Sequence, residues 1–125
     1  MSPQTALIDS YIATWNETDA ARRRALIARI WTEDAHYVDP LMQAYGHAGI
    51  DAMVQGMQER FPRHRFHRVG EVDAFRDHVR FAWTLAPLDR DAEGAMHAQG
   101  TDFGVVADGR LRSITGFLDP AAVQA

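Results

Sequence analysis

Residues 100–111 read Gly-Thr-Asp-Phe-Gly-Val-Val-Ala-Asp-Gly-Arg-Leu, and this stretch decides the fold. Its first eight residues belong to a β-favouring segment, and Asp108-Gly109 favours a tight two-residue turn between antiparallel strands. A second β-favouring segment follows the turn. The stretch therefore predicts a hairpin of two strands, at 95–107 and 110–118.

Two more β-favouring segments, at 64–75 and 78–87, precede this hairpin. A turn at Asp77 separates them, and a longer polar loop at 89–94 leads into the hairpin. Four consecutive strands with short connections predict an antiparallel meander. A short strand at 35–38 is expected at the margin of the same sheet.

The N-terminal half instead has apolar residues at the three- and four-residue spacing of helices. It predicts one helix at 4–17 and another at 20–32, the second with Asp19 as its N-cap. A third amphipathic stretch covers 50–61 and stops at Pro62, which cannot continue a helix. Helices followed by a meander predict an α+β fold with the N-terminal helices packed on one face of the sheet.

Composition limits the size and the chemistry of the protein. A chain of 125 residues, 46% of them hydrophobic, fits one domain at 1–125. The net charge is −4, and the arginines at 22–24 are expected to form a solvated helix face, not a nucleic-acid site. No leader or membrane span is expected, which favours a cytoplasmic protein. The sequence has no cysteine and no lysine, which excludes thiolate and Schiff-base chemistry.

Two aspartates, Asp39 and Asp102, stand in β-favouring stretches where a buried carboxylate would be costly without a function. Alternation puts Asp102 on one strand face with Gly100 and Gly104, which would leave room for a ligand if that face is internal. Alternation alone equally allows a solvent-exposed Asp102. Asp39 precedes a proline, which holds it extended at a strand end, facing either a pocket or a loop.

The motif at 37–40, Tyr-Val-Asp-Pro, together with Gly-Thr-Asp at 100–102 before the Asp-Gly-Arg-Leu turn, resembles the nuclear transport factor 2-like superfamily. Within it the chain is similar to the SnoaL-like branch, which includes ketosteroid isomerase relatives and polyketide cyclases. The resemblance covers residues 7–119. It implies a strongly curved sheet around the helices, a cone-shaped α+β barrel with a small-molecule pocket at its open end. It also implies a homodimer through the outer sheet face, where contributions are expected from Arg80, His97 and Phe103.

The resemblance further implies roles for three residues. In ketosteroid isomerase relatives the aspartate that matches Asp39 shuttles a proton, and the residues that match Tyr11 and a protonated Asp102 stabilise the enolate. The region between the first two helices is longer here, so Trp15 is an alternative to Tyr11 as the pocket residue. No cofactor is expected.

A pocket lined by aromatic and methionine side chains would favour a small, flat, apolar or carbonyl-containing ligand. Core packing alone would also explain each of the candidate ligand-binding residues, which are Trp15, Trp31, Met42, Met53, Met57, Phe81, Trp83 and Phe117. No metal is expected, because His64 and His67 fall on opposite faces of one strand. His36 and His97 are open to surface, interface or proton-transfer roles.

Two functions stay open at this point. One is a cofactor-independent isomerase or cyclase that transfers a proton next to a carbonyl. The other is a non-catalytic ligand-binding or structural domain of the same fold. An epoxide hydrolase is disfavoured, because such relatives need a second aspartate near their arginine and Arg80-Phe81-Ala82 lacks it.

Overall fold

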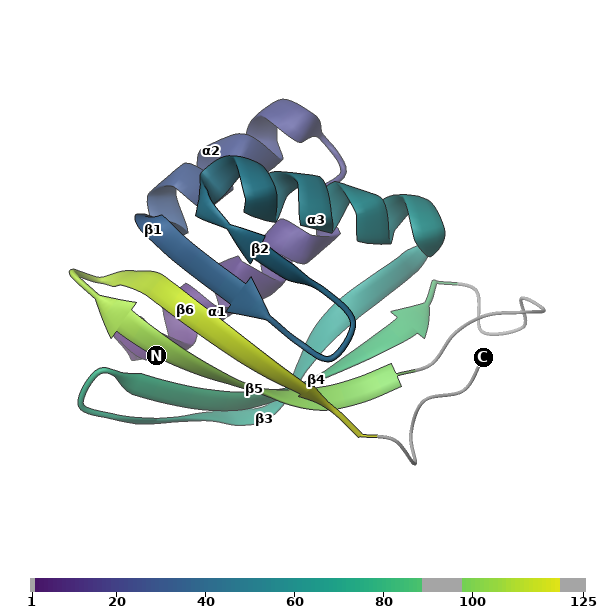
Figure 1. Ribbon diagram of the computed structural model, residues 1–125. Helices are drawn as coiled ribbons and strands as arrows, with labels where there is room; N and C mark the ends of the chain where they lie inside the picture. The colour runs from purple at the N-terminus through teal and green to yellow at the C-terminus, as the bar shows by residue number, and fades with distance from the viewer. Residues whose placement is uncertain (1, 89–97, 120–125) are drawn as a thin grey trace.

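The computed structural model describes residues 2–88 and 98–119. The helices are α1 (Pro3–Asn16), α2 (Ala20–Ile30) and α3 (Gly46–Arg60). The strands are β1 (Trp31–Val38), β2 (Gln43–Tyr45), β3 (His64–Phe75), β4 (His78–Pro87), β5 (Ala98–Ala107) and β6 (Arg110–Leu118). Figure 1 shows the three helices along one face of a curved sheet, which wraps around them without closing. The predicted α+β class, with helices in the concave face of the sheet, is confirmed.

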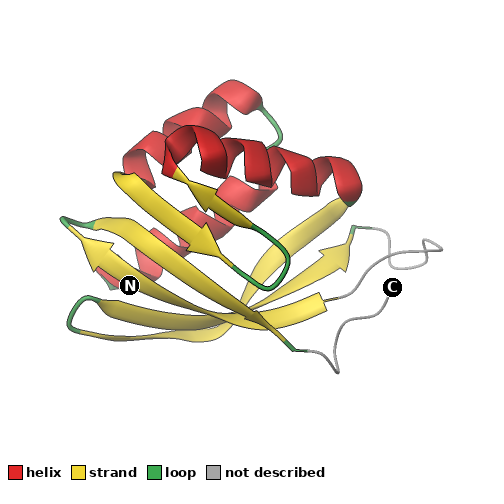
Figure 2. Cartoon of the chain, viewed as in Figure 1, coloured by secondary structure: helices red, strands yellow, loops and turns green. Residues whose placement is uncertain are grey.

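The six strands follow the order β2-β1-β6-β5-β4-β3. All neighbours are antiparallel except β1 and β6, which run parallel. The predicted meander is thus confirmed, and it is drawn as the long yellow strands of Figure 2. Asp108 and Gly109 have φ angles of 53° and 76°, the positive values that the predicted two-residue turn requires.

The start of β1 corrects two predictions. The helix expected at 20–32 ends at Ile30, and the strand expected at 35–38 begins at Trp31. A register shift between Trp31 and His36 lets the strand continue from the helix while the Trp31 side chain stays in the core. Because β2 pairs with β1, the strand predicted at the sheet margin is the second from the edge.

The helix ends follow local sequence signals. Ser2 caps α1 by accepting a hydrogen bond from the Thr5 backbone N–H, and Pro3 occupies the first turn. Asp19 is the predicted N-cap of α2, and its Oδ1 accepts from the Arg22 N–H at 2.9 Å. Gly46 has a φ of 70° where the chain turns into α3, a conformation that favours glycine.

The hydrophobic core lies between the helices and the concave face of the sheet. Its fully buried members are Ile8, Ile27, Trp31, Ile50, Val54, Phe81, Leu111 and Ile114. They come from all three helices and from β1, β4 and β6, so the core joins every layer of the fold. No helix in the described part of the chain has the length and apolar character needed to cross a bilayer.

Arg23 contradicts the prediction that residues 22–24 form a solvated face, because its side chain is buried. Its guanidinium donates to Asp51 Oδ1 at 2.6 Å and to the side-chain oxygens of Gln55 and Gln58. The neighbouring arginines remain exposed. The middle arginine turns inward because α3 supplies acceptors that offset the cost of desolvating its charge.

Candidate functional site

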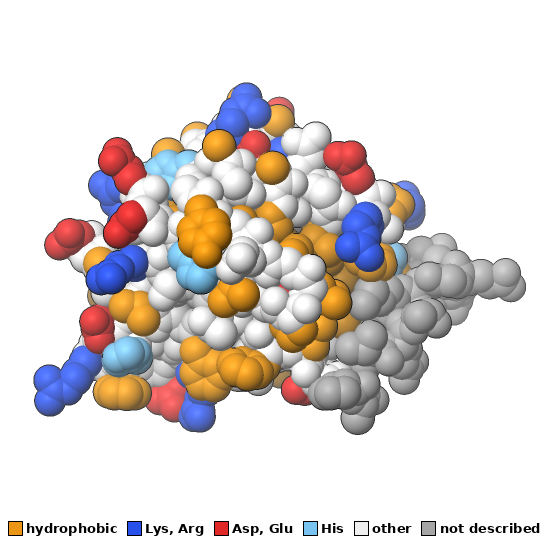
Figure 3. Space-filling view, viewed as in Figure 1, with side chains coloured by type: hydrophobic (Ala, Val, Ile, Leu, Met, Phe, Trp, Pro, Cys, Tyr) orange, Lys and Arg blue, Asp and Glu red, His pale blue; other side chains and the backbone are white. Residues whose placement is uncertain are grey.

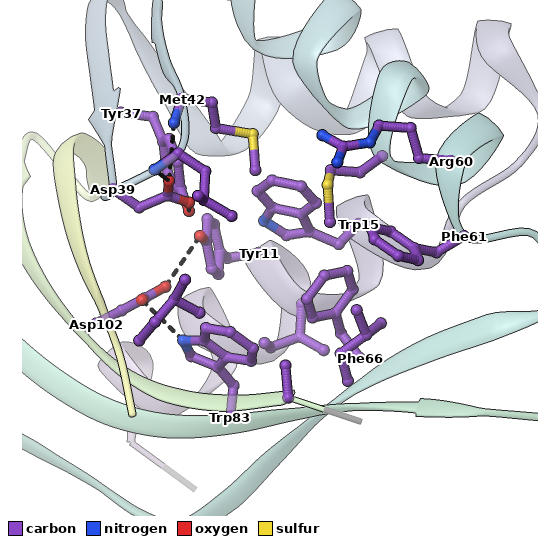
Figure 4. A pocket seen from close by; sticks show the side chains of 16 residues that line it. Tyr11, Trp15, Tyr37, Asp39, Met42, Arg60, Phe61, Phe66, Trp83 and Asp102 are labelled. Atoms are coloured by element: carbon purple, nitrogen blue, oxygen red, sulfur yellow. Dashed lines mark hydrogen bonds between the residues drawn. The ribbon is translucent and has the colours of Figure 1, made fainter. Parts of the chain in front are cut away.

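A cavity of about 100 Å³ lies between α1, the C-terminal half of α3 and the concave face of the sheet. Its lining is mostly apolar, and five polar side chains reach it from separate elements: Tyr11 of α1, Tyr37 of β1, Asp39 after β1, Asp102 of β5 and Arg60 of α3. Figure 4 shows these side chains converging on one space. In Figure 3, hydrophobic side chains are visible at the surface below α3. The two aspartates and the tyrosine that the resemblance singled out therefore share one cavity.

Asp102 is buried on the inner face of β5, as one of the two strand-face alternatives predicted. Its Oδ2 accepts a hydrogen bond from the Tyr11 hydroxyl at 3.1 Å, and its Oδ1 accepts from the Trp83 indole at 2.8 Å. Burial raises the pKa of Asp102 to about 7, and the Trp83 and Tyr11 donors offset part of that rise, while the charge of Asp39 adds to it. Asp102 is therefore present both protonated and ionised near neutral pH.

The glycines beside Asp102 serve a different purpose from the one predicted. A Cβ at Gly100 would lie 2.7 Å from Cζ2 of Trp83, and one at Gly104 would lie 2.9 Å from Cδ1 of Ile114. At Gly100 the backbone oxygen of Phe117 is nearer still. Backbone and side-chain atoms of the protein therefore occupy the space that was expected to be left for a ligand. Gly100 instead admits the indole that donates to Asp102.

Asp39 both lines the cavity and organises the loop that follows β1. Its Oδ1 accepts from the backbone N–H groups of Leu41 and Met42, at 2.8 and 3.0 Å. Its Oδ2 accepts from the Tyr37 hydroxyl at 2.6 Å. Both alternatives raised from the sequence, a pocket and a loop role, are therefore realised together.

Tyr37 was missed as a site residue, although alternation along β1 places it on the same face as Asp39. Burial, followed by the charges of Asp102 and Asp39, raises the pKa of Tyr37 above its ordinary value of 10.0. The pKa of Tyr11 is also raised, first by burial and then by the charge of Asp102. Both phenols consequently stay protonated and act as donors at neutral pH.

Gly116 of β6 brings the two acids together. A Cβ at this position would lie 2.8 Å from Oδ1 of Asp102 and 3.3 Å from Cβ of Asp39. The side chains of the two aspartates thus flank a strand position without a side chain. The signal in the sequence was a glycine inside a predicted strand. Such a glycine often marks a position where another part of the chain or a ligand comes close to the strand backbone.

The eight predicted ligand-binding residues divide by position. Four of them line the cavity: Trp15, Met42, Met57 and Trp83. Trp31 and Phe81 instead pack in the core against the Tyr11 ring, and Met53 packs against that core. Phe117 points to the outer sheet face, 56% exposed, because Gly116 takes the inward position on β6. Contact with a ligand stays a prediction for the four that line the cavity.

Tyr11 and Trp15 were alternatives for the residue of the first helix that faces the pocket, and the structure places both there. Both side chains line the cavity, one turn of α1 apart, and only Tyr11 bonds to Asp102. Asn16 holds this end of α1 in place by pairing with both the N–H and the carbonyl of Phe66 in β3, each at 2.9 Å. Phe66 also lines the cavity, and so does Arg60, which was not predicted because it lies in no recognisable motif.

The histidines lie away from this chemistry or beyond the described residues. His36 stacks on Tyr45 with ring centroids 4.5 Å apart and approaches Gln43 at the sheet edge. His97 falls outside the described residues. Within 2–88 and 98–119, no three potential metal-ligating side chains cluster.

Residues 8–114 match the SnoaL-like domain family. This chain belongs to that family. A SnoaL-like candidate isomerase from Agrobacterium tumefaciens is 39% identical in sequence, with a TM-score of 0.86 over 95% of this chain and 99% of that one. A search of curated proteins found no match to this SnoaL-like chain.

More distant structures share the fold of this SnoaL-like protein. A candidate SnoaL-like polyketide cyclase from Jannaschia is 18% identical, with a TM-score of 0.70 over 95% of this chain and 90% of that chain. An epoxide hydrolase from M. tuberculosis is 14% identical, with a TM-score of 0.69 over 96% of this chain and 85% of that chain. Relatives with different described activities therefore share the scaffold, and the reaction must be argued from the site.

Proposed function

We propose that this SnoaL-like protein is a cofactor-independent isomerase or cyclase that transfers a proton next to a carbonyl group. The observation that supports it is the convergence of two carboxyl groups, one buried with a pKa near 7, on an apolar cavity. The carbonyl oxygen of the ligand lies toward Asp102 and Tyr11, and the adjacent carbon lies toward Asp39. The similar candidate isomerase from Agrobacterium agrees with this reading at the level of the family.

The reaction begins when the Asp39 carboxylate removes a proton from the carbon next to the carbonyl. The C–H bonding pair becomes the C=C bond of an enolate, and the negative charge moves to the carbonyl oxygen. Protonated Asp102 donates a hydrogen bond to that oxygen, joined by Tyr11 when its hydroxyl turns from Asp102 to the ligand. Asp39 then returns the proton at another carbon, which completes an isomerisation. Attack of the enolate carbon on a second carbonyl would instead give a cyclisation, in which the C=O π bond of that carbonyl breaks and its oxygen takes the proton held by Asp39.

Tyr37 and the backbone N–H groups of the loop after β1 position the base. Their three hydrogen bonds hold both oxygens of the Asp39 carboxylate, so the group cannot rotate away from the cavity. Proton transfer then uses a lone pair of Asp39 that these donors leave free.

The test is conversion of β,γ-unsaturated ketones to their conjugated isomers, together with turnover of small diketones. We expect Asp39→Asn to lower kcat/KM by about 100-fold or more, as loss of a general base does. Asp34→Asn is the matched control, because Asp34 is an exposed acid of the preceding strand β1 and does not line the cavity. Equal turnover by wild type and Asp39→Asn would exclude Asp39 as the base.

The pH profile separates the roles of the two acids. If Asp102 donates as a protonated acid, kcat/KM falls as the pH rises through about 7, the pKa of that group. If Asp102 were the base, kcat/KM would rise over the same interval. The sign of the slope near neutral pH therefore decides which aspartate removes the proton.

A ligand-binding protein without catalysis is the second candidate function. It is favoured by the three hydrogen bonds that Asp39 already accepts, which would suit a purely structural carboxylate. Binding of a carbonyl compound without proton exchange at its α-carbon would support this function over the first.

A further inference from the structure

The cavity carries opposite charges at its two ends. The carboxyl groups of Asp39 and Asp102 lie together at one end, and Arg60 lies at the other with its guanidinium directed toward the cavity (Figure 4). Asp102 is 3% exposed, whereas Arg60 and Leu41 belong to the exposed residues and mark the rim. We propose that the substrate is a single-ring carbonyl compound with a carboxylate at the end remote from the carbonyl, and that Arg60 binds this carboxylate.

Among residues 2–88 and 98–119, no carboxylate neutralises the charge of Arg60. Arg23, Arg68 and Arg80, in contrast, each form an ion pair with an aspartate. Its guanidinium carbon lies 5.5 Å from the centroid of the Phe61 ring, also in the lining, so the aromatic ring holds the cation at the rim. A planar guanidinium with free N–H donors matches the two oxygens of a carboxylate.

The charges at the inner end determine the orientation of such a molecule. A ligand carboxylate placed beside Asp39 and a partly ionised Asp102 would meet like charge, whereas the same group at Arg60 meets opposite charge. The carbonyl end is left for the carboxyl groups, as the proposed function requires. The placement of the carbonyl end rests on the proposed function, whereas the binding of a carboxylate by Arg60 does not.

The size of the cavity limits the enclosed part of the ligand. A cavity needs roughly 10–15 Å³ of internal volume to hold one water molecule. The volume of about 100 Å³ therefore accommodates on the order of ten non-hydrogen atoms. That number suits one ring with short substituents. The rings of Trp15, Phe66 and Trp83 pack edge-on or tilted against one another in the lining and offer apolar aromatic surface to it.

Arg60 also occupies the last turn of a helix, where a cation stabilises the helix dipole. This role alone would not involve a ligand. Arg29 provides the matched control, because it holds the same last-turn position in α2 and does not line the cavity. Comparing the two arginines separates the helix contribution from binding.

The experiment is calorimetric titration of wild type, Arg60→Gln and Arg29→Gln with two probes of equal size, 4-acetylbenzoate and neutral 4-acetylbenzamide. At about pH 6, below the pKa of Asp102 of about 7, we expect wild type to bind the acid about fivefold to tenfold more tightly than the amide. Arg60→Gln should abolish this preference and Arg29→Gln should retain it. Added salt should weaken binding of the acid alone.

Three results would overturn the inference: no binding of 4-acetylbenzoate, equal affinity of wild type for both probes, or a preference that survives in Arg60→Gln. Deuterium incorporation into the acetyl methyl group in D₂O, followed by NMR in the same samples, reports proton transfer separately. A preference for the acid that depends on Arg60 but comes without exchange would support the anion site and contradict the proposed reaction. Exchange without that preference would support the proposed reaction and contradict the anion site.

Discussion

Asp102 is the residue at which the proposed function and the stability of the fold are most directly opposed. Its pKa is about 7 in the folded protein and near the ordinary 3.8 in the unfolded chain. Between these values the folded state binds more protons, so the free energy of unfolding decreases as the pH rises from about 4 to about 7 and then levels off. The buried carboxyl group of Asp102 thus makes the protein less stable at neutral pH than at mildly acidic pH.

Asp102→Asn should remove this dependence, because the amide keeps an acceptor for the Trp83 indole and carries no charge. Relative to wild type, we expect the variant to gain about 2–4 kcal/mol between pH 4 and pH 8, the energy of a shift of about three pKa units discounted for relaxation. Urea unfolding followed by tryptophan fluorescence at both pH values measures it. Parallel stability profiles of variant and wild type would contradict the assigned pKa.

The residues of the site were predictable to different degrees. Two-residue alternation and the family resemblance together placed Asp102 inside, because a strand has only two faces. Tyr37 and Gly116 escaped prediction for different reasons. The Tyr37–Asp39 bond joins residues two apart, which alternation could have indicated, whereas the approach of Gly116 to both aspartates depends on the pairing of β6 with β5 and β1, which no local pattern reveals. Phe117 was assigned to the wrong face, because without the register of β6 an aromatic residue is as plausible inside as outside.

One buried arginine, Arg23, joins the helices. Arg23 of α2 bonds to the carbonyl of Glu17 after α1 and to three side chains of α3. The helix pattern predicted α1 to within one residue at each end, because its apolar stripe follows one face. It placed the start of α3 at residue 50, although this helix begins at Gly46. It failed at Arg23 and at the α2–β1 boundary, where the position of a partner element decides between exposure and burial.

Arg23→Met should lower the free energy of unfolding by about 3 kcal/mol, because Asp51 and two glutamines lose their buried partner. Arg22→Met, an exposed neighbour in the same helix, should change it by less than about 0.5 kcal/mol. Thermal and urea unfolding of the two variants provide the comparison. Adding Asp51→Leu to Arg23→Met should recover part of the loss, and a further loss in the double variant would count against this interpretation of the network.

For the whole molecule, the outer face of the sheet is the surface expected to form the homodimer. Phe103 and Phe117 lie in edge-to-face contact on neighbouring strands, 44% and 56% exposed, next to the Arg80–Asp73 ion pair. Exposed aromatic clusters of this kind are typical of protein–protein contacts. The dimer stays a prediction, and His97, also proposed for it, lies outside the described residues.

Sedimentation velocity tests this surface. We expect wild type to sediment as a dimer and Phe103→Ser to shift it toward monomer, since the substitution removes apolar area at the centre of the contact. Tyr45→Ser is the control, because Tyr45 is also an exposed aromatic residue, 64% against 44% for Phe103, but lies on β2 at the sheet edge. A monomeric wild type, or a fully dimeric Phe103→Ser, would show that this face is not the interface.

The parallel pairing of β1 with β6 joins segments that lie far apart in the sequence. Tyr37 aligns with Ile114 and Val38 with Thr115, so the first strand of the chain pairs with the last one. Before β6 docks, Asp39 has no position beside Gly116, and β1 and β2 can pair only with each other. Contacts so distant in sequence close slowly. The helices and the hairpins are local in sequence, whereas the chamber that would hold a substrate is complete only when β1 is paired with β6.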